Sequence, residues 1–249
     1  MDPVVLITAG VKDEAKSLPI FLEQIDNLDY PKDRLRYAVY TSPSEDNSIE
    51  IILNWLKTKP DAWWHHMALD LPLRKRMYLQ GNFMRQYAQY QQPDLEPIEY
   101  IFHCDADVTE IPSETLRTLV GFNVDVVAPY IYMSAENNPF NHFRNQRIFR
   151  DVYGYRFKYG PHPGLQFNSS VPEYYKRNYL TDDSIKADKE RHLIPMLSVG
   201  ANPVLYKASL FDKVKYDGLY AFPGLCLELD KAGYGVWSHP LLECIHDWR

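Results

Sequence analysis

The sequence predicts an α/β fold in which a mostly parallel central sheet is flanked by helices. In the first half of the chain, short apolar runs of strand length alternate with segments whose apolar residues recur at helical spacing. This alternation is typical of βαβ units and therefore of parallel sheets. A length of 249 residues, 45% of them hydrophobic, supplies a substantial core. We expect a single domain over residues 1–249.

The order of the elements follows from these patterns. Asp13 and Glu14 open the first helix, because acidic side chains favour a helix N-terminus. Pro112 opens another, because proline is tolerated in the first turn. Helices are expected at 13–25, around 51–56, at 73–91, from 112 and at 225–232. Strands are expected at 4–8, 37–41, 100–104, 124–129, 196–199, 203–206 and 241–245.

Between about residues 131 and 193 the alternation breaks. This segment is rich in aromatic residues, proline and glycine, but it has no clear period. We interpret it as an insertion packed on the core. It is either a wall of the substrate site or an irregular structural segment.

Composition narrows the class of protein. The net charge of −6 and the pI near 5.7 argue against nucleic-acid binding and against a polybasic membrane patch. The sequence has no signal-peptide pattern and no apolar run of membrane-spanning length. We therefore expect a cytoplasmic protein, or a domain excised from a longer polypeptide. Cys104, Cys226 and Cys244 are widely spaced in apolar stretches, which indicates buried free thiols.

The most informative motif follows the strand expected at 100–104. Asp105 and Asp107 come directly after it, and in an extended chain residues two apart point to the same side. Ligands of open α/β sheets bind beyond the carboxyl ends of the strands. Hard divalent cations are often held by one or two carboxylates plus substrate phosphates. The pair predicts a metal–diphosphate site; a solvated turn is the alternative.

The helix expected at 73–91 has two distinct faces at about 100° per residue. One face is apolar and carries Met77, Met84, Tyr87 and Ala88. The other is basic and polar, and comprises Arg74, Lys75, Tyr78, Asn82 and Arg85. This second face suits contact with a sugar nucleotide or its pyrophosphate, and a solvated surface is the alternative.

Several further segments belong together by their order and spacing. They are TAGVKDE (8–14), LPIFL (18–22), DYPK (29–32), DNSIEI (46–51), WLK (55–57), VGANPVLYKA (199–208), AGYGV (232–236) and IHDW (245–248). Together they resemble the nucleotide-sugar glycosyltransferases of the GT-A fold. The segments within 29–57 are similar to the procollagen galactosyltransferase domain, and 199–208 is similar to fungal Golgi mannosyltransferases.

The resemblance implies one GT-A-like, Rossmann-like domain, with a nucleotide-sugar-binding half at 1–130 and an acceptor-side half at 131–249. It implies that Asp107 ligates a Mn²⁺ or Mg²⁺ ion that bridges the donor diphosphate. Asp105 would join the metal site, or contact the donor ribose or a basic partner on the helix. His246 would be a further metal ligand, because imidazole is acceptable to Mn²⁺; an ordinary strand-end histidine is the alternative.

The resemblance also implies a set of substrate-binding residues. Two acids would contact the base or the ribose, and the helix would supply basic and polar partners. The set comprises Ala9, Asp13, Asp46, Lys75, Asn82, Arg85 and Asp105. His239, which precedes a proline, is interpreted as structural.

The catalytic base is where the sequence departs from the family pattern. Many inverting relatives carry a Glu-Asp pair about a dozen residues before the Gly-Tyr element, but Ala221 and Phe222 occupy that position here. The base is then Asp217 or a residue of the insertion such as Asp151, or the enzyme retains configuration and needs no such base.

The resulting hypothesis is a metal-dependent glycosyltransferase that moves a hexose from a nucleoside-diphosphate sugar to a glycan or glycoprotein acceptor. A sugar nucleotidyltransferase is one alternative. Such enzymes usually have a Gly-rich, basic loop after the first strand, and the sequence AGVK at 9–12 is a poor version of that loop. A glycosyltransferase-like binding subunit without turnover is the other, and the missing acidic pair motivates it.

Overall fold

The computed structural model describes residues 1–89, 95–133, 148–149, 155–159, 170–200, 203–214 and 221–246. The helices are α1 (Leu18–Asp26), α2 (Ser48–Leu56), α3 (Leu73–Gln89), α4 (Thr115–Gly121), α5 (Ser170–Asn178) and α6 (Ala221–Lys231). The strands are β1 (Val5–Val11), β2 (Leu35–Thr41), β3 (Ala62–His66), β4 (Tyr100–His103), β5 (Val108–Glu110), β6 (Val126–Met133), β7 (Ile148–Phe149), β8 (Arg156–Phe157), β9 (Ile194–Ser198), β10 (Val204–Lys207) and β11 (Val236–His246).

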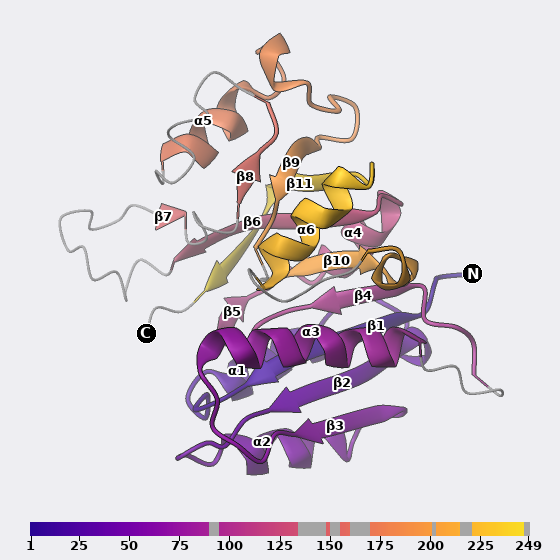
Figure 1. Ribbon diagram of the computed structural model, residues 1–249, viewed down its shortest axis with the longest axis vertical. Helices are drawn as coiled ribbons and strands as arrows, with labels where there is room; N and C mark the ends of the chain where they lie inside the picture. Colours follow the sequence, from indigo (N-terminus) through magenta and orange to yellow (C-terminus); the bar gives the residue numbers. More distant parts are fainter. Residues whose placement is uncertain are drawn as a thin grey trace.

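These strands form one sheet in the order β3-β2-β1-β4-β10-β6-β11-β9-β8, with β5 paired to β11 and β7 to β6 (Figure 1). The strands β3, β2, β1 and β4 pair in parallel, as do β6 and β11. Because β10 is antiparallel to both β4 and β6, these two halves run in the same direction. The mostly parallel sheet expected from the sequence is confirmed.

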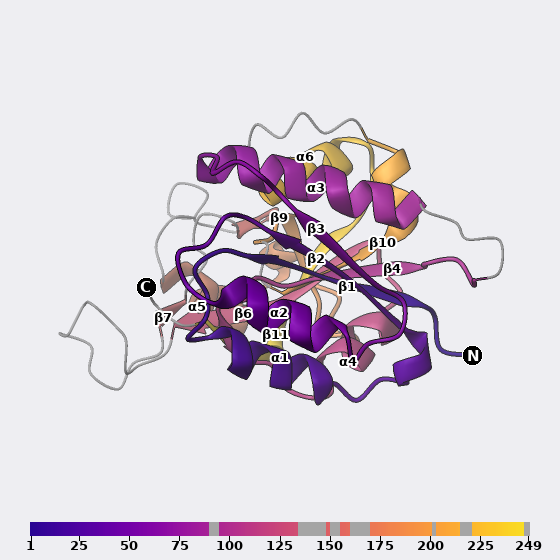
Figure 2. The same ribbon diagram turned by 90° about the horizontal axis from the view of Figure 1, so that it is seen from below.

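Helices cover both faces of this sheet (Figure 2), and each face has its own apolar core. On one face, α1, α2 and α4 pack through residues such as Phe21, Ile52 and Leu116. On the other face, α3, α5 and α6 pack through residues such as Met84 and Tyr175. Each large apolar side chain buried in this way contributes about 1.5–3 kcal/mol. The α/β layering therefore follows from strands that are buried on both sides.

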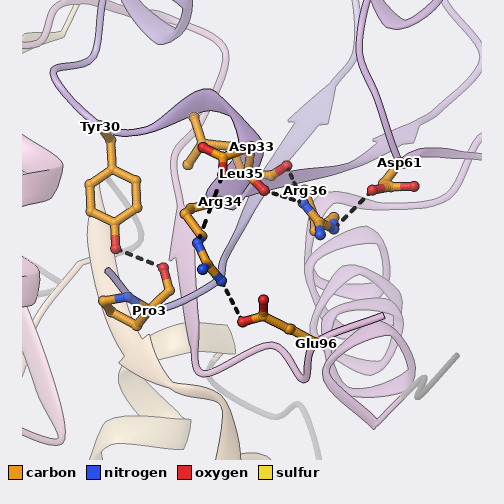
Figure 3. Close-up of polar contacts among 8 residues, drawn as sticks. All are labelled: Pro3, Tyr30, Asp33, Arg34, Leu35, Arg36, Asp61 and Glu96. Atoms are coloured by element: carbon orange, nitrogen blue, oxygen red, sulfur yellow. Dashed lines mark hydrogen bonds and ion pairs between the residues drawn. The ribbon is translucent and has the colours of Figure 1, made fainter. Parts of the chain in front are cut away.

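Ion pairs and hydrogen bonds secure the amino ends of the strands (Figure 3). Arg36 Nε lies 3.0 Å from Asp61 Oδ2, which ties the start of β2 to the start of β3. Arg34 contacts Glu96, just before β4, and the Tyr30 hydroxyl donates to the carbonyl of Pro3 at 2.8 Å. Contacts within the chain thus occupy the amino edge of the sheet. A ligand site is expected among the loops at the opposite, carboxyl edge.

Several elements differ from the expectation. The short strands β5, β7 and β8 were not expected, α4 begins at Thr115 rather than 112, and β11 begins at Val236 rather than 241. The first helix begins at Leu18 rather than Asp13, because Asp13 has a left-handed φ of 53° and cannot continue a helix. The edge strand β3 was not expected from the sequence. Nor was α5, which lies inside the supposedly irregular segment and buries Val171 and Tyr175 at helical spacing.

Two expectations from composition can be compared with the described residues. Cys104, Cys226 and Cys244 are free and buried, as expected, and burial raises the pKa of each thiol. No helix in the described ranges has both the length and the apolar character that crossing a bilayer requires.

Candidate functional site

A cavity of about 320 Å³ lies at the carboxyl ends of β1, β2 and β4, beside the first turns of α3; we refer to it as the β1–β4 pocket. In Figure 1 the arrowheads of β2, β3 and β4 point to the left, towards this edge. The pocket is lined by Gly10, Val11, Lys12, Asp13, Glu14, Tyr40, Ser42, Leu73, Arg76, Met77, Gln80, Asp105, Ala106 and Asp107. Its position matches the carboxyl-edge crevice in which open α/β sheets bind ligands.

The loops after β1 and β2 are fastened to each other by two aspartates. Asp13 Oδ1 accepts a hydrogen bond from the backbone N–H of Glu45 at 2.7 Å. Asp46 Oδ2 accepts one from the N–H of Ala15 at 2.9 Å, and its Oδ1 accepts from Ser48. Burial opposes ionisation of Asp46, but the hydrogen bonds from Ser48 and Ala15 outweigh it and lower its pKa. These bonds give the pocket a defined wall.

The carboxylate of Asp107 faces the imidazole of His246, and the distance from Oδ1 to Nε2 is 3.0 Å. Both side chains are largely buried, with exposed fractions of 22% for Asp107 and 4% for His246. Among the described residues, Asp107 Oδ1 is a buried oxygen whose contact with His246 is not a hydrogen bond of good geometry. A buried anionic oxygen is costly unless a cation compensates it, and a neutral imidazole carries no such charge.

Strand pairing explains why residues 139 positions apart meet here. The antiparallel pairing of β5 with β11 places His246 opposite Val108, next in sequence to Asp107. A register shift between His239 and Glu243 on β11 precedes this pairing and redirects the end of the strand. Such irregularities are common beside functional sites because they re-aim side chains.

The residues at this position fit a divalent cation by their chemistry. A carboxylate oxygen of Asp107 and an imidazole nitrogen of His246, both acceptable to Mn²⁺, lie 3.0 Å apart and would hold the ion from one side. No group of three His, Cys, Asp or Glu side chains in the described ranges is arranged to hold a metal. Two protein ligands suffice when substrate phosphates supply further oxygens.

Asp105 lines the same pocket, but it contacts a different histidine. Its Oδ1 lies 3.5 Å from Nε2 of His103, which is fully buried. His103 Nδ1 lies 3.0 Å from the Thr8 hydroxyl, and its Nε2 lies 3.4 Å from Gln80 Nε2. This buried polar chain connects β1, β4 and α3 at the pocket floor, and it fixes the environment of Asp105.

The reason given above for the convergence of the two aspartates was wrong. Strand β4 ends at His103, and residues 105–107 form a turn in which the Val108 N–H bonds to the Asp105 carbonyl at 3.3 Å. Asp105 and Asp107 therefore share a pocket because of this turn, and not because an extended strand alternates its side chains.

The pocket carries more negative than positive charge. Four carboxylates line it, from Asp13, Glu14, Asp105 and Asp107, against the two basic side chains of Lys12 and Arg76. The formal charge of the lining is thus −2. A surface of this sign attracts a divalent cation and, without one, repels a diphosphate.

The structure places the other expected site residues outside this lining. Ala9 is buried in the core, and the carboxylate of Asp46 is occupied by the loop contacts described above. Lys75 is exposed, and neither it nor Asn82 lines the pocket. Arg85 lies near the other end of α3, where its Nη2 donates to the carbonyl of Val214 at 3.0 Å.

The expected catalytic base cannot be compared with the structure. Asp217 and Asp151 both lie outside the described residues. Ala221 and Phe222, which occupy the place of the acidic pair in the sequence pattern, are the first two residues of α6.

Sequence reasoning missed Lys12, Tyr40, Arg76 and Gln80. The signal for Lys12 was its place directly after the first strand, at the carboxyl edge of the sheet. Arg76 and Gln80 are four residues apart and share a helix face with Met77, which was assigned to the core. The inward face of α3 lines the pocket in its first turns and the core further along, where Phe83 and Met84 are buried.

The chain is similar in sequence to curated glycosyltransferases. It is 24% identical over 189 residues to a "Glycosyltransferase 25 family member" of Drosophila melanogaster, which covers 68% of this chain and 31% of that protein. It is 28% identical over 151 residues to "Procollagen galactosyltransferase 1-B" of Xenopus laevis, which covers 55% of this chain and 24% of that protein. The matched region thus spans about a quarter to a third of these relatives.

Solved structures share the fold at low sequence identity. The mannosyltransferase PcManGT from Pyrobaculum calidifontis, in complex with GDP-Man and Mn²⁺, has a TM-score of 0.60 at 14% identity, covering 99% of this chain and 57% of that one. GalNAc-T7 with UDP, GalNAc and Mn²⁺ has a TM-score of 0.64 at 10% identity, covering 99% and 44%. These neighbours confirm the expected GT-A fold.

A family model agrees with both comparisons. Residues 2–151, more than half of the chain, match the model described as "Glycosyltransferase family 25, N-terminal domain". Because this match covers more than half of the chain, and the structure has its pocket at the carboxyl edge of a GT-A sheet, the chain belongs to glycosyltransferase family 25.

Proposed function

We propose that the chain binds a nucleoside-diphosphate sugar in the β1–β4 pocket together with Mn²⁺ or Mg²⁺, and transfers a hexose to a glycan or glycoprotein acceptor. The observation that carries this proposal is the buried Asp107 oxygen, which faces His246 and belongs to a pocket whose lining has a formal charge of −2. Membership of family 25 supports the reaction class. The structural neighbours in complex with GDP-Man or UDP and Mn²⁺ support the choice of ligands.

The charge of the pocket makes the cation a condition for donor binding. A lining of formal charge −2 opposes a diphosphate, and a bound divalent cation removes that opposition. Asp107 and His246 would hold the ion. When bound, it stabilises the negative charge that develops on the departing nucleoside diphosphate. We expect nucleotide affinity to be low without the metal.

The chain's own residues position the loops and the carboxylates of the site. The hydrogen bonds of Asp13 and Asp46 fix the loops around the nucleotide, and the buried contact with His103 holds Asp105 where a ribose or the cation can meet it. Asp217 remains our candidate for the base that takes the proton of an acceptor hydroxyl. An inverting transfer needs such a carboxylate within hydrogen-bond reach.

Donor hydrolysis tests the proposal. Purified protein is incubated with UDP- and GDP-hexoses, with and without Mn²⁺, and the release of nucleoside diphosphate is measured. We expect release that requires the cation. Pyrophosphate release from a sugar phosphate and a nucleotide would instead indicate a nucleotidyltransferase. Nucleotide binding without turnover across a broad acceptor panel would indicate a binding subunit.

A further inference from the structure

An ion pair joins two loops at the edge of the β1–β4 pocket. Lys12, in the loop after β1, places its Nζ 2.5 Å from Oδ1 of Asp70, in the loop between β3 and α3. The lysine lines the pocket and is 25% exposed, whereas the aspartate is 62% exposed. An exposed pair of this kind is only weakly stabilising, so its partners exchange readily.

The second basic side chain of the pocket acts on the same carboxylate through its charge, without a direct contact among the described residues. Arg76, from the first turns of α3, lines the pocket, and its Nε is buried without a hydrogen-bond partner in the described part of the chain. The hydrogen bond from Lys12, together with the charges of Lys12 and Arg76, lowers the pKa of Asp70. Two cations on the pocket wall therefore act on one exposed carboxylate.

We propose that Lys12 and Arg76 receive the diphosphate of the nucleotide, and that Asp70 is an internal competitor which holds Lys12 until the nucleotide binds. This inference rests on the proposed function of the β1–β4 pocket. A diphosphate offers several anionic oxygens to a lysine and an arginine, and such charge-assisted contacts are stronger than an exposed carboxylate pair. On binding, Lys12 exchanges Asp70 for a phosphate oxygen.

The competition predicts effects of opposite sign from the two halves of one ion pair. Lys12→Met removes a phosphate contact, so it weakens nucleotide binding. Asp70→Asn releases Lys12 and removes a nearby negative charge, so it strengthens binding. A pair that only held the two loops together would weaken binding in both variants, because each breaks the same contact. A plain charge effect of Asp70 would also give opposite signs, but it would be the same size with and without Lys12.

Calorimetry of the full chain with UDP and with GDP, each in the presence of MnCl₂, measures these effects. We expect Lys12→Met and Arg76→Met to weaken binding about tenfold or more, as for the loss of a hydrogen bond to a charged group. Asp70→Asn should tighten binding about two- to fivefold. In the Lys12→Met background, Asp70→Asn should tighten binding less than it does alone, because the lysine that it releases is absent and only the removal of a nearby negative charge remains.

Matched variants control for charge and for folding. Lys16→Met removes an exposed lysine from the same loop, and Asp183→Asn breaks an exposed lysine–aspartate pair far along the chain. Both should leave nucleotide affinity unchanged, and thermal unfolding reports whether each variant folds. Unchanged or weaker binding by Asp70→Asn, or unchanged binding by Lys12→Met, overturns the competition. Failure of the unmodified chain to bind either nucleotide overturns the proposed function itself.

Discussion

Substitution of Gly10 tests the packing of the pocket floor. A Cβ built on Gly10 lies 2.6 Å from Gln80 Nε2, 2.8 Å from its Oε1 and 2.9 Å from its Cδ. These distances are shorter than any real carbon contact allows. Gln80 also lines the β1–β4 pocket, so its amide can move aside only by giving up its buried position 3.4 Å from the imidazole of His103. We expect Gly10→Ala to destabilise the fold by about 1–3 kcal/mol, the usual range for overpacking.

A double-mutant cycle separates this clash from other effects of the alanine. Gln80→Ala removes the obstructing amide, so adding Gly10→Ala in that background should cost much less than it does alone. Urea unfolding of the four proteins gives the free energies of unfolding. Equal costs of Gly10→Ala with and without the Gln80 side chain would refute the contact, as would a Gly10→Ala protein as stable as the original.

Three further outcomes follow from the structure. His246→Ala should weaken Mn²⁺ affinity at least about tenfold with the fold intact, and a normal Mn²⁺ titration would remove His246 from the site. Burial, and then the charge of His192, lowers the pKa of His239. The contribution of His239 to the free energy of unfolding is therefore present above the ordinary histidine pKa and is lost as the pH falls. In urea unfolding, His239→Gln should make the free energy of unfolding depend less on pH, and an unchanged pH profile contradicts this. Trp55→Phe should cost about 1 kcal/mol by removing an indole hydrogen bond to Asp26; unchanged urea unfolding refutes that.

The order of strands and helices was readable because it depends on local periodicity. Buried strands such as β1 and β2 are short apolar runs, and α1 repeats Leu18, Phe21 and Ile25 at helical spacing. The start of α1 was not readable, because Asp13 resembles a helix-opening acid. In the structure its carboxylate instead binds the loop after β2, a contact 32 residues away that no local pattern encodes.

The candidate site was also predictable only in part. The juxtaposition of Asp107 with His246 agrees with the expectation, which came from the resemblance and not from spacing. The face of α3 that lines the pocket differs from the polar face singled out in the sequence, because a helical wheel ranks faces by polarity alone. The inward face begins at the pocket with Arg76 and Gln80 and continues into the core, so a polar start and an apolar continuation belong to one face.

Nucleotide binding by an Asp107 variant tests the central claim most directly. Calorimetry with UDP or GDP and Mn²⁺ should show cation-dependent binding for the unmodified chain and none for Asp107→Ala, because the carboxylate that would hold the ion is lost. Glu110→Ala, an exposed carboxylate three residues further on, should bind normally. Full retention of Mn²⁺-dependent affinity in Asp107→Ala would contradict the assignment of this pocket.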